Sequence, residues 1–321
     1  MSAYAHIPVM LREVVENLAI PKGGRAIDLT LGLGGHAEAL LLKADDDVRY
    51  LGVDRDPEAR DIALQRLGKD ERFSVIASTY EDVWETKCLQ EWMIRYASDG
   101  LDIVLADLGA SSLQFKTPGR GFSFMVEGPL DMRMDATSGL TALEWLERQD
   151  EITLADVLYK YGEERASRPI SNAIIRALES GKLRTTLDLA NSIYTVLPRE
   201  IAKRKKRIDP ATRTFQAIRI AVNAELVGLE QTIEKAVSSL KLCGRIGIIS
   251  FHSLEDRIVK QTFRRLAGIY DGPGREPPMK MPKFLQIISP GGIKPGEAEC
   301  AANPPSRSAR LRLAQRVPCS V

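Results

Sequence analysis

Cysteine and histidine are both scarce in this sequence of 321 residues. Its cysteines form no C-x-x-C pair, so neither a zinc site nor a disulfide framework is expected, and a reducing compartment fits best. Long apolar runs are also lacking, because no segment approaches the roughly 18 apolar residues of a membrane helix. The first residues, MSAYAHIPVMLREVV, lack the basic and apolar parts of a signal peptide. We therefore expect a cytoplasmic protein with no membrane partner.

An excess of charge of one sign is missing as well, because the formal net charge is only +2. Basic residues nevertheless cluster between Arg199 and Arg219, and again after Glu299, where no acidic residue follows. Such clusters can follow a phosphate backbone, although a solvated helix face has the same composition. We predict RNA contacts for these residues of the first cluster: Lys203, Arg204, Lys205, Lys206, Arg207 and Arg213.

What is present is the composition of a folded globular protein, with 44% hydrophobic and 27% charged residues. In the first third, the short apolar runs RAIDLT, YLGVD, FSVIAS and LDIVLAD are each followed by polar or amphipathic sequence. This alternation predicts parallel strands covered by helices on both faces, with ligands at the carboxyl ends of the strands. The runs GRIGIISF, FLQIISP and ARLRLAQRV are predicted as further strands, which completes an α/β fold with a mostly parallel seven-stranded sheet.

Residues 118–208 interrupt this pattern, because they show several helix starts but no clear strand. Thr141, Thr153 and Thr185 each precede an acidic residue by three positions, as N-cap residues do in capping boxes. We predict an inserted helical domain over 118–208, carried by a first domain made of residues 1–117 and 209–321.

Two helices are predicted where the sheet resumes. One begins at Asp209 as the N-cap, with Pro210 in the first helical position, and its apolar spacing continues to Val237. After the strand GRIGIISF, the segment SLEDRIVKQTFRRL predicts a helix that is capped by Ser253.

The first two strands predict a site for an adenosine-containing cofactor. The first strand ends in Asp28 and turns into a helix through Gly34 and Gly35, where backbone N–H groups can approach a ligand closely. The second strand ends in Asp54, about 20 residues beyond the glycines, where a carboxylate can accept hydrogen bonds from both ribose hydroxyls.

The identity of the cofactor depends on Asp28. The spacing Gly32-x-Gly34-x-x-Ala37 also satisfies the dinucleotide fingerprint, so an NAD-dependent dehydrogenase on a similar fold is an alternative. A carboxylate at the end of the first strand would repel a pyrophosphate, but it can pair with the ammonium group of S-adenosylmethionine. This favours S-adenosylmethionine, and no nicotinamide site is recognisable.

A third acidic residue, Asp107, ends the fourth strand ahead of a turn of small residues, DLGASS. It should meet the acids that end the first two strands at one edge of the sheet. Of the three histidines, His36 is expected to touch the cofactor, and His6 and His252 to bond locally. We therefore expect no metal site.

Motifs along nearly the whole chain resemble one known family. They are HIPVM, DLTLGLGGH, VDRDP, DLGASSLQ, RGFSF, GPLDMRMD, YGEE, DPATRTFQAIRIAVNAEL, SFHSLEDRIVK and NPPSRSARLR. Together they are similar to the bacterial ribosomal RNA small subunit methyltransferase H family, also called MraW. Two departures stand out, because the family reads DLGVSS where this chain has DLGASS, and it has a histidine in place of Asp209.

The resemblance implies a class I, Rossmann-like, S-adenosylmethionine-dependent methyltransferase with an inserted helical domain that recognises the substrate. It implies methylation of N4 of one cytidine in the decoding region of 16S rRNA, with the small ribosomal subunit as partner, and a homo-oligomer is compatible with it. The family's cofactor contacts fall on Gly34, Gly35, His36, Asp54, Tyr80, Asp107 and Gln114, with Tyr80 where the family often has Phe.

The implied reaction indicates a catalytic role for Asp107. The N4 atom of cytosine is a poor nucleophile, so we predict that Asp107 accepts one of its N–H groups. The aromatic residue that stacks on the base is left open among Phe122, Phe124 and Phe251. The alternatives are methylation of another RNA or of a small molecule, and a catalytically silent RNA-binding protein that keeps the fold.

Overall fold

The computed structural model describes residues 7–199, 208–269 and 282–320, and the chain divides into two compact units. The first unit combines residues 1–109 with 227–321, and the second spans 110–226. The second unit thus begins earlier and ends later than the range 118–208 that the sequence pattern indicated. In the described ranges, no helix has the length and apolar character that a membrane crossing requires.

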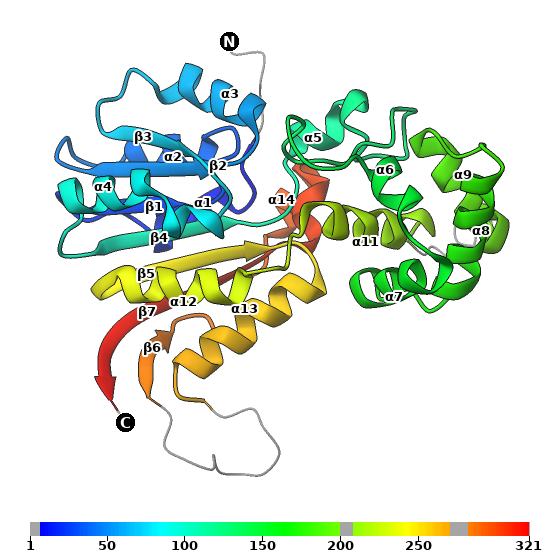
Figure 1. Ribbon diagram of the computed structural model, residues 1–321. Coiled ribbons are helices and arrows are strands. Elements are labelled where there is room, and N and C mark those ends of the chain that lie inside the picture. The colour runs from blue at the N-terminus through cyan, green and yellow to red at the C-terminus, as the bar shows by residue number, and fades with distance from the viewer. Residues whose placement is uncertain (1–6, 200–207, 270–281, 321) are drawn as a thin grey trace. The chain divides into compact units, whose positions relative to one another are not determined.

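The first unit is built on a seven-stranded sheet with the order β3-β2-β1-β4-β5-β7-β6 (Figure 1). Strands β1 to β5 pair in parallel with one another, and β7 runs antiparallel to both β5 and β6. The predicted mostly parallel seven-stranded sheet is confirmed. The strands are β1 (Arg25–Asp28), β2 (Arg49–Asp54), β3 (Phe73–Ala77), β4 (Leu101–Asp107), β5 (Leu240–Ser250), β6 (Lys283–Ile287) and β7 (Arg310–Ser320).

Helices cover both faces of this sheet, and each face has its own hydrophobic core. One core includes Leu40 and Ala63, and the other includes Trp92, Ile233 and Phe263. Strands covered on both faces are apolar in near-continuous runs, which is why the short runs in the sequence predicted them correctly. The first face carries α1 (Leu11–Asn17), α2 (Gly35–Leu41) and α3 (Pro57–Leu67), and the second carries α4 (Lys87–Tyr96), α12 (Leu229–Ser239) and α13 (Ser253–Leu266).

The cap of α13 differs from the prediction, because the N-cap residue is His252 and not Ser253. The Nδ1 atom of His252 accepts a hydrogen bond from the Glu255 N–H at 3.4 Å. The Glu255 carboxylate in turn accepts hydrogen bonds from the N–H groups of Phe251 at 2.8 Å and His252 at 3.3 Å. An imidazole nitrogen thus does what a serine hydroxyl usually does at a helix start, and rules based on the commonest cap residues miss it.

The second unit is helical and has a hydrophobic core of its own. The capping boxes predicted at Thr141 and Thr185 are confirmed at the starts of α6 and α9. The one predicted at Thr153 is wrong, because Asp150 caps α7 by accepting a hydrogen bond from the Thr153 N–H at 2.7 Å. The helices are α5 (Ser112–Lys116), α6 (Ala142–Glu147), α7 (Glu151–Gly162), α8 (Ser167–Glu179), α9 (Thr186–Val196) and α11 (Ala211–Asn223).

The single long helix predicted from Asp209 onward is instead two helices, α11 and α12. Ala224 has a φ of 53° and Gly228 a φ of 70°, so left-handed residues end the first helix and precede the second. Pro210 rather than Asp209 occupies the N-cap position of α11, and Asp209 Oδ1 accepts a hydrogen bond from the Ala211 N–H at 3.0 Å. Apolar spacing does not reveal the break, because each helix buries an apolar face at helical spacing.

Helix α11 belongs to the second unit because it shares that unit's core. Phe215 of α11 and Leu158 of α7 are both buried in it. Asn223, the last residue of α11, donates a hydrogen bond to the Met132 carbonyl at 2.7 Å and accepts one from the Met134 N–H at 2.7 Å. The motif GPLDMRMD is therefore attached to the end of this helix by a buried amide.

Candidate cofactor site at the carboxyl edge of the sheet

Three carboxylic acids end three adjacent strands of the first unit. β1 lies between β2 and β4, and Asp28 is in register with Gly52 of β2 and with Leu105 of β4. Asp54 and Asp107 end these two neighbouring strands two residues further along. Because all three strands are parallel, the three acids lie along one edge, where α/β sheets bind their ligands.

The turn from β1 to α2 requires glycine at two positions. Gly34 has a φ of +76°, and a Cβ there would lie 3.3 Å from the side chains of Ala63 and Leu67. A Cβ on Gly35 would lie only 2.4 Å from Cγ of Pro8. Packing and backbone conformation thus account for both glycines by themselves, and their predicted contact with the cofactor stays a prediction.

Asp54 is held at the strand end by backbone groups. Its Oδ2 atom accepts a hydrogen bond from the Gly32 N–H at 2.7 Å, and its Oδ1 atom accepts one from the Asp56 N–H at 2.9 Å. Burial raises the pKa of Asp54, and these two hydrogen bonds oppose the rise. Each carboxylate oxygen still has a second lone pair, so the residue can accept a hydrogen bond from each of two vicinal hydroxyls.

Asp28 is 1% exposed and lies below the edge. Its carboxylate accepts hydrogen bonds from the Thr30 N–H at 3.1 Å and from the Tyr50 hydroxyl at 3.2 Å. Burial raises the pKa of Asp28 to about 7 and the charge of Asp107 adds to the rise, while His36 opposes it. A desolvated carboxyl group of this kind is stabilised in its ionised form by a cation, which fits the predicted pairing with an ammonium group.

Asp107 and His36 face each other beside it. His36 Nε2 lies 3.6 Å from Asp107 Oδ2, and His36 is 5% exposed. Among the described residues, neither Asp107 Oδ1 nor either ring nitrogen of His36 has a hydrogen-bond partner. Buried polar atoms without partners are rare in folded proteins, and a functional role is one of the explanations for them. The edge therefore offers unused acceptors and donors next to an acid that favours a cation.

The two remaining predicted cofactor residues have structural roles that account for their positions. Tyr80 is 9% exposed and belongs to the hydrophobic core that also contains Val83 and Ile233, so its ring contributes to packing. Gln114 lies in the second unit, where its amide group accepts a hydrogen bond from the Ser111 N–H at 2.9 Å and closes the capping box of α5. The cofactor contacts of Tyr80 and Gln114 stay predictions.

The predicted RNA contacts are described only in part. Lys203, Arg204, Lys205, Lys206 and Arg207 lie outside the described residues, as does His6. Arg213 is exposed on α11, and its guanidinium group lies 3.9 Å from the Glu164 carboxylate.

The three candidate stacking aromatics also differ in their surroundings. Phe122 is 4% exposed and packs edge-on against Phe115, and Phe124 packs edge-on against Phe215 at 5.0 Å between ring centroids. Phe251 is partly buried in the first unit and directly follows β5. It is therefore the candidate that lies at the same sheet edge as the three acids.

Two residues of the site were missed by the sequence reading. The Tyr50 hydroxyl bonds Asp28, and Thr30 Oγ1 accepts a hydrogen bond from the Asp107 N–H at 2.5 Å. Thr30 links the ends of β1 and β4, which are far apart in sequence. Nothing in the local sequence distinguishes Tyr50 from a core residue of β2, because its partner is known only from the register of the sheet.

The strand order and this edge define the class of the protein. A dinucleotide-binding sheet has the order 3-2-1-4-5-6, whereas here the antiparallel β7 is inserted between β5 and β6. This is the topology of class I methyltransferases, which use S-adenosylmethionine, and it argues against the dehydrogenase alternative. The model of the MraW methylase family matches residues 3–317. The chain therefore belongs to the MraW methylase family.

Individual relatives agree with this assignment. The chain is 43% identical to the ribosomal RNA small subunit methyltransferase H of Acinetobacter baumannii, over 98% of both chains. It is 44% identical to the protein of the same name from Stenotrophomonas maltophilia, over 98% of this chain and 94% of that one. Among solved structures, an rRNA methylase from Streptococcus thermophilus superposes with a TM-score of 0.38 at 10% identity over 96% of this chain and 93% of its own, and we draw no conclusion from so low a score.

The role of Asp54 can be tested by replacing it with alanine. We expect Asp54→Ala to weaken the binding of S-adenosylmethionine by about 100-fold, because two hydrogen bonds to a charged acceptor are lost, each contributing about 1.5 kcal/mol or more. Titration calorimetry would measure this. Asp56→Ala is the matched control, because Asp56 caps α3 through the Glu58 N–H and should affect stability only. Equal losses in both variants would mean that loop folding, and not a ribose contact, is responsible.

The raised pKa of Asp28 predicts a pH-dependent stability. Between the ordinary value of 3.8 and about 7, the folded protein binds more protons than the unfolded chain, so this residue's contribution to stability falls as pH rises through that window. Asp28→Asn should therefore be more stable than the unsubstituted protein at pH 8, by about 2–3 kcal/mol after one lost hydrogen bond is subtracted. The difference should shrink toward pH 5.

Urea unfolding at both pH values, without cofactor, would measure this difference. Asp61→Asn removes one exposed carboxylate on α3 and is the matched control. If the difference in unfolding free energy between Asp28→Asn and the unsubstituted protein does not change with pH, the pKa of Asp28 is not raised in the folded protein.

Proposed function

We propose that this protein methylates N4 of a cytidine in the decoding region of 16S rRNA. The printed names of its 43–44% identical relatives, ribosomal RNA small subunit methyltransferase H, support a substrate in the small subunit. The observation that carries the choice of an exocyclic amine is the buried Oδ1 atom of Asp107, which has no hydrogen-bond partner among the described residues. Such an atom can accept an N–H group of the substrate.

The chemistry of an amino group explains why an acceptor is needed. The lone pair of cytosine N4 is delocalised into the ring, so the nitrogen is a weak nucleophile. When bound, S-adenosylmethionine supplies a methyl group that its sulfonium already activates. The protein therefore contributes mainly by positioning the nitrogen, and by accepting an N–H hydrogen bond so that the lone pair becomes available.

Asp107 is arranged for this task. Its backbone is fixed by the Thr30 hydroxyl, and its Oδ2 atom faces Nε2 of His36 at 3.6 Å. The distance from His36 Nε2 to this carboxylate is too long for a hydrogen bond, and Oδ1 has no partner among the described residues, so Oδ1 is available to the substrate. When the methyl group passes from the sulfonium sulfur to N4, the amine must lose one N–H proton, and Oδ1 would accept it.

Recognition of the RNA is assigned to the inserted helical unit and its basic cluster. Arg213 is exposed on α11 and can contact a phosphate, although its positive charge is partly compensated by the nearby Glu164 carboxylate. The run from Lys203 to Arg207 precedes that helix in the sequence and carries five positive charges. Phe251 is the candidate for stacking on the base. Phosphate contacts would position the RNA, while the residues at the sheet edge would select the base.

Mapping of methylated nucleotides tests the function. Small subunits from a strain that lacks this protein would be incubated with it and with labelled S-adenosylmethionine, and the labelled nucleotide in 16S rRNA would be identified. We expect one N4-methylated cytidine in the decoding region. If the label appears on a different RNA or on a different atom, the proposed substrate is wrong. If no methyl group is transferred to any RNA, the alternative of a catalytically silent RNA-binding protein is favoured.

A variant of Asp107 tests the mechanism. Asp107→Ala should lower the single-turnover rate of methyl transfer by about 100-fold or more, the usual loss for a positioned proton acceptor, while RNA affinity stays within about threefold. Asp102→Ala is the matched control, because Asp102 lies at the other end of β4 and bonds Arg25 and Lys241. If Asp107→Ala transfers methyl at the control's rate, Asp107 is structural and the acceptor is elsewhere, with Asp131 as the next candidate.

A further inference from the structure

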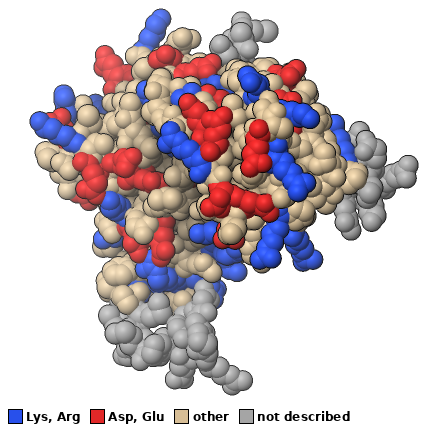
Figure 2. Space-filling view, turned by 45° about the vertical axis from the view of Figure 1, so that its right-hand side comes forward, with Lys and Arg blue, Asp and Glu red and all other residues tan. Residues whose placement is uncertain are grey.

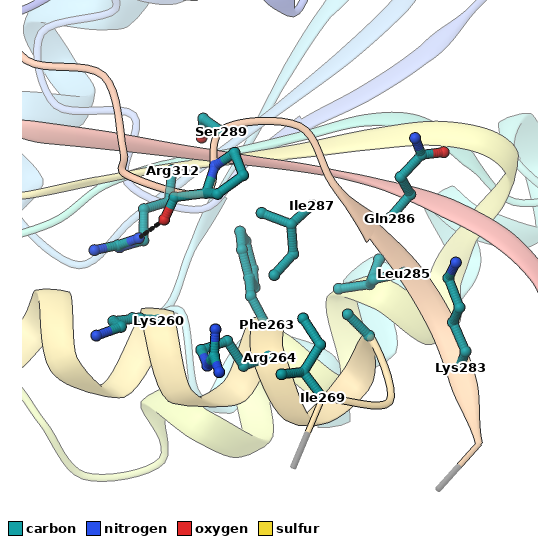
Figure 3. Close-up of a pocket in the computed structure, with 12 residues that line it drawn as sticks. Lys260, Phe263, Arg264, Ile269, Lys283, Leu285, Gln286, Ile287, Ser289 and Arg312 are labelled. Atoms are coloured by element: carbon teal, nitrogen blue, oxygen red, sulfur yellow. Dashed lines mark hydrogen bonds between the residues drawn. The ribbon is translucent and has the colours of Figure 1, made fainter. Parts of the chain in front are cut away.

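A groove in the first unit lies between α13 and β6, outside the candidate cofactor site. It has a volume of about 320 Å³. Its floor is apolar and includes Phe263 and Ile287, and basic side chains rise beside it, with Lys260 and Arg264 from α13 and Lys283 from β6 (Figure 3). An apolar floor with cationic walls is suited to a ligand that is anionic but not uniformly polar.

The described side chains that line this groove carry charge of one sign only. Among the described residues that line it, four are basic and none is Asp or Glu. One of the four, Arg312, is 5% exposed and already satisfied, because it donates to both carboxylate oxygens of Asp256 at 2.7 and 3.0 Å. It also donates to the Pro290 carbonyl at 3.3 Å and so helps to hold the turn after β6 (Figure 3).

The two lysines of the groove are not compensated in this way. Lys260 and Lys283 are exposed, and neither has a carboxylate within 4.0 Å in the described part of the chain. Elsewhere on α13 the contrast is clear, because Arg265 pairs with Glu230 at 2.9 Å and also with Glu234. On the face shown in Figure 2, basic and acidic side chains are interspersed. Uncompensated cations within one groove therefore mark a local preference for an anion.

The groove begins at the same edge of the sheet as the three acids. In β5, Ile249 is in register with Asp107 of β4, and the preceding Ile248 is in register with Arg312 of β7. Arg312 is thus two strands from Asp107, which is roughly 10 Å at about 4.8 Å per strand. From this end, which includes Ser289, the groove runs along β6 toward Lys283. A chain of anions that starts at the cofactor edge could continue along it.

We propose that this groove binds the phosphate backbone of the rRNA strand that flanks the methylated nucleotide. This inference rests on the proposed rRNA substrate, because a long polyanion that must reach Asp107 is the ligand that the continuity of groove and sheet edge favours. Lys260 and Lys283 contact phosphates, and the apolar side chains of Ile269 and Ile287, which are partly or largely exposed in the groove, pack against sugar. Contacts of this kind position an RNA without reading its sequence.

Reversing the charge of the two lysines tests the proposal. The double variant Lys260→Glu/Lys283→Glu would be compared with Lys22→Glu/Lys69→Glu, which makes the same change in net charge at exposed lysines of the first unit away from the groove. Filter binding of 16S rRNA across a salt series would measure affinity, and methyl transfer with labelled S-adenosylmethionine would measure kcat and KM.

For the groove variant, we expect rRNA affinity to fall by about tenfold or more, and the slope of log affinity against log salt to shrink by about 1.4–1.8 for two phosphate contacts. Affinity for S-adenosylmethionine and kcat at saturating RNA should equal those of the unsubstituted protein. The control variant should keep the affinity and slope of the unsubstituted protein.

Two results would overturn the proposal. The first is equal rRNA affinity and slope in the groove and control variants. The second is unchanged binding to protein-free 16S rRNA with weaker binding to assembled subunits, which would assign the groove to an acidic ribosomal protein. If the unsubstituted protein fails to methylate 16S rRNA, the proposed function is wrong. If it methylates 16S rRNA and the groove variant binds this RNA as the control variant does, only the proposal about the groove is wrong.

Discussion

The candidate site depends on the parallel pairing of β1 with β2 on one side and with β4 on the other. This pairing brings the acids that end these strands, Asp28, Asp54 and Asp107, to one edge of the sheet. Burial raises the pKa of both Asp28 and Asp54. An edge of this kind is stabilised by a ligand that brings positive charge and hydrogen-bond donors, and S-adenosylmethionine has both in its ammonium and ribose groups.

The three acids are also tied to one another through neighbouring elements. The Gly32 N–H of the turn after β1 bonds Asp54 of β2, and the Thr30 hydroxyl of the same turn bonds the backbone of Asp107 in β4. Tyr50 of β2 bonds Asp28 of β1. Each contact crosses from one strand end to another, so a change at one acid alters the positions of the others. Effects of substitutions at these acids on stability are therefore not expected to be additive.

The strands and some helix starts, such as those at Thr141 and Thr185, could be predicted because their signals are local. Runs such as LDIVLAD are apolar since both faces of the sheet are covered, and a capping box such as Thr141 with Glu144 closes within one turn. Predictions were wrong where the same local sequence pattern is compatible with two different structures. Apolar spacing continues across the break at Ala224, and His252 takes the cap that Ser253 would usually take. Backbone conformation at one residue decided the first case and an uncommon cap residue the second.

By itself, the sequence determined the strands and their order along the chain, the family, and which acids end which strands. Only the tertiary structure decided that Tyr50 and Thr30 support these acids, that Asp107 Oδ1 and the ring nitrogens of His36 lack partners among the described residues, and that Lys260 and Lys283 share one groove. The physical reason is the distance along the chain between the residues that interact. Strand patterns and caps arise from contacts a few residues apart, whereas burial, pKa shifts and the meeting of charges depend on segments that are far apart in the chain and adjacent only after the sheet has formed.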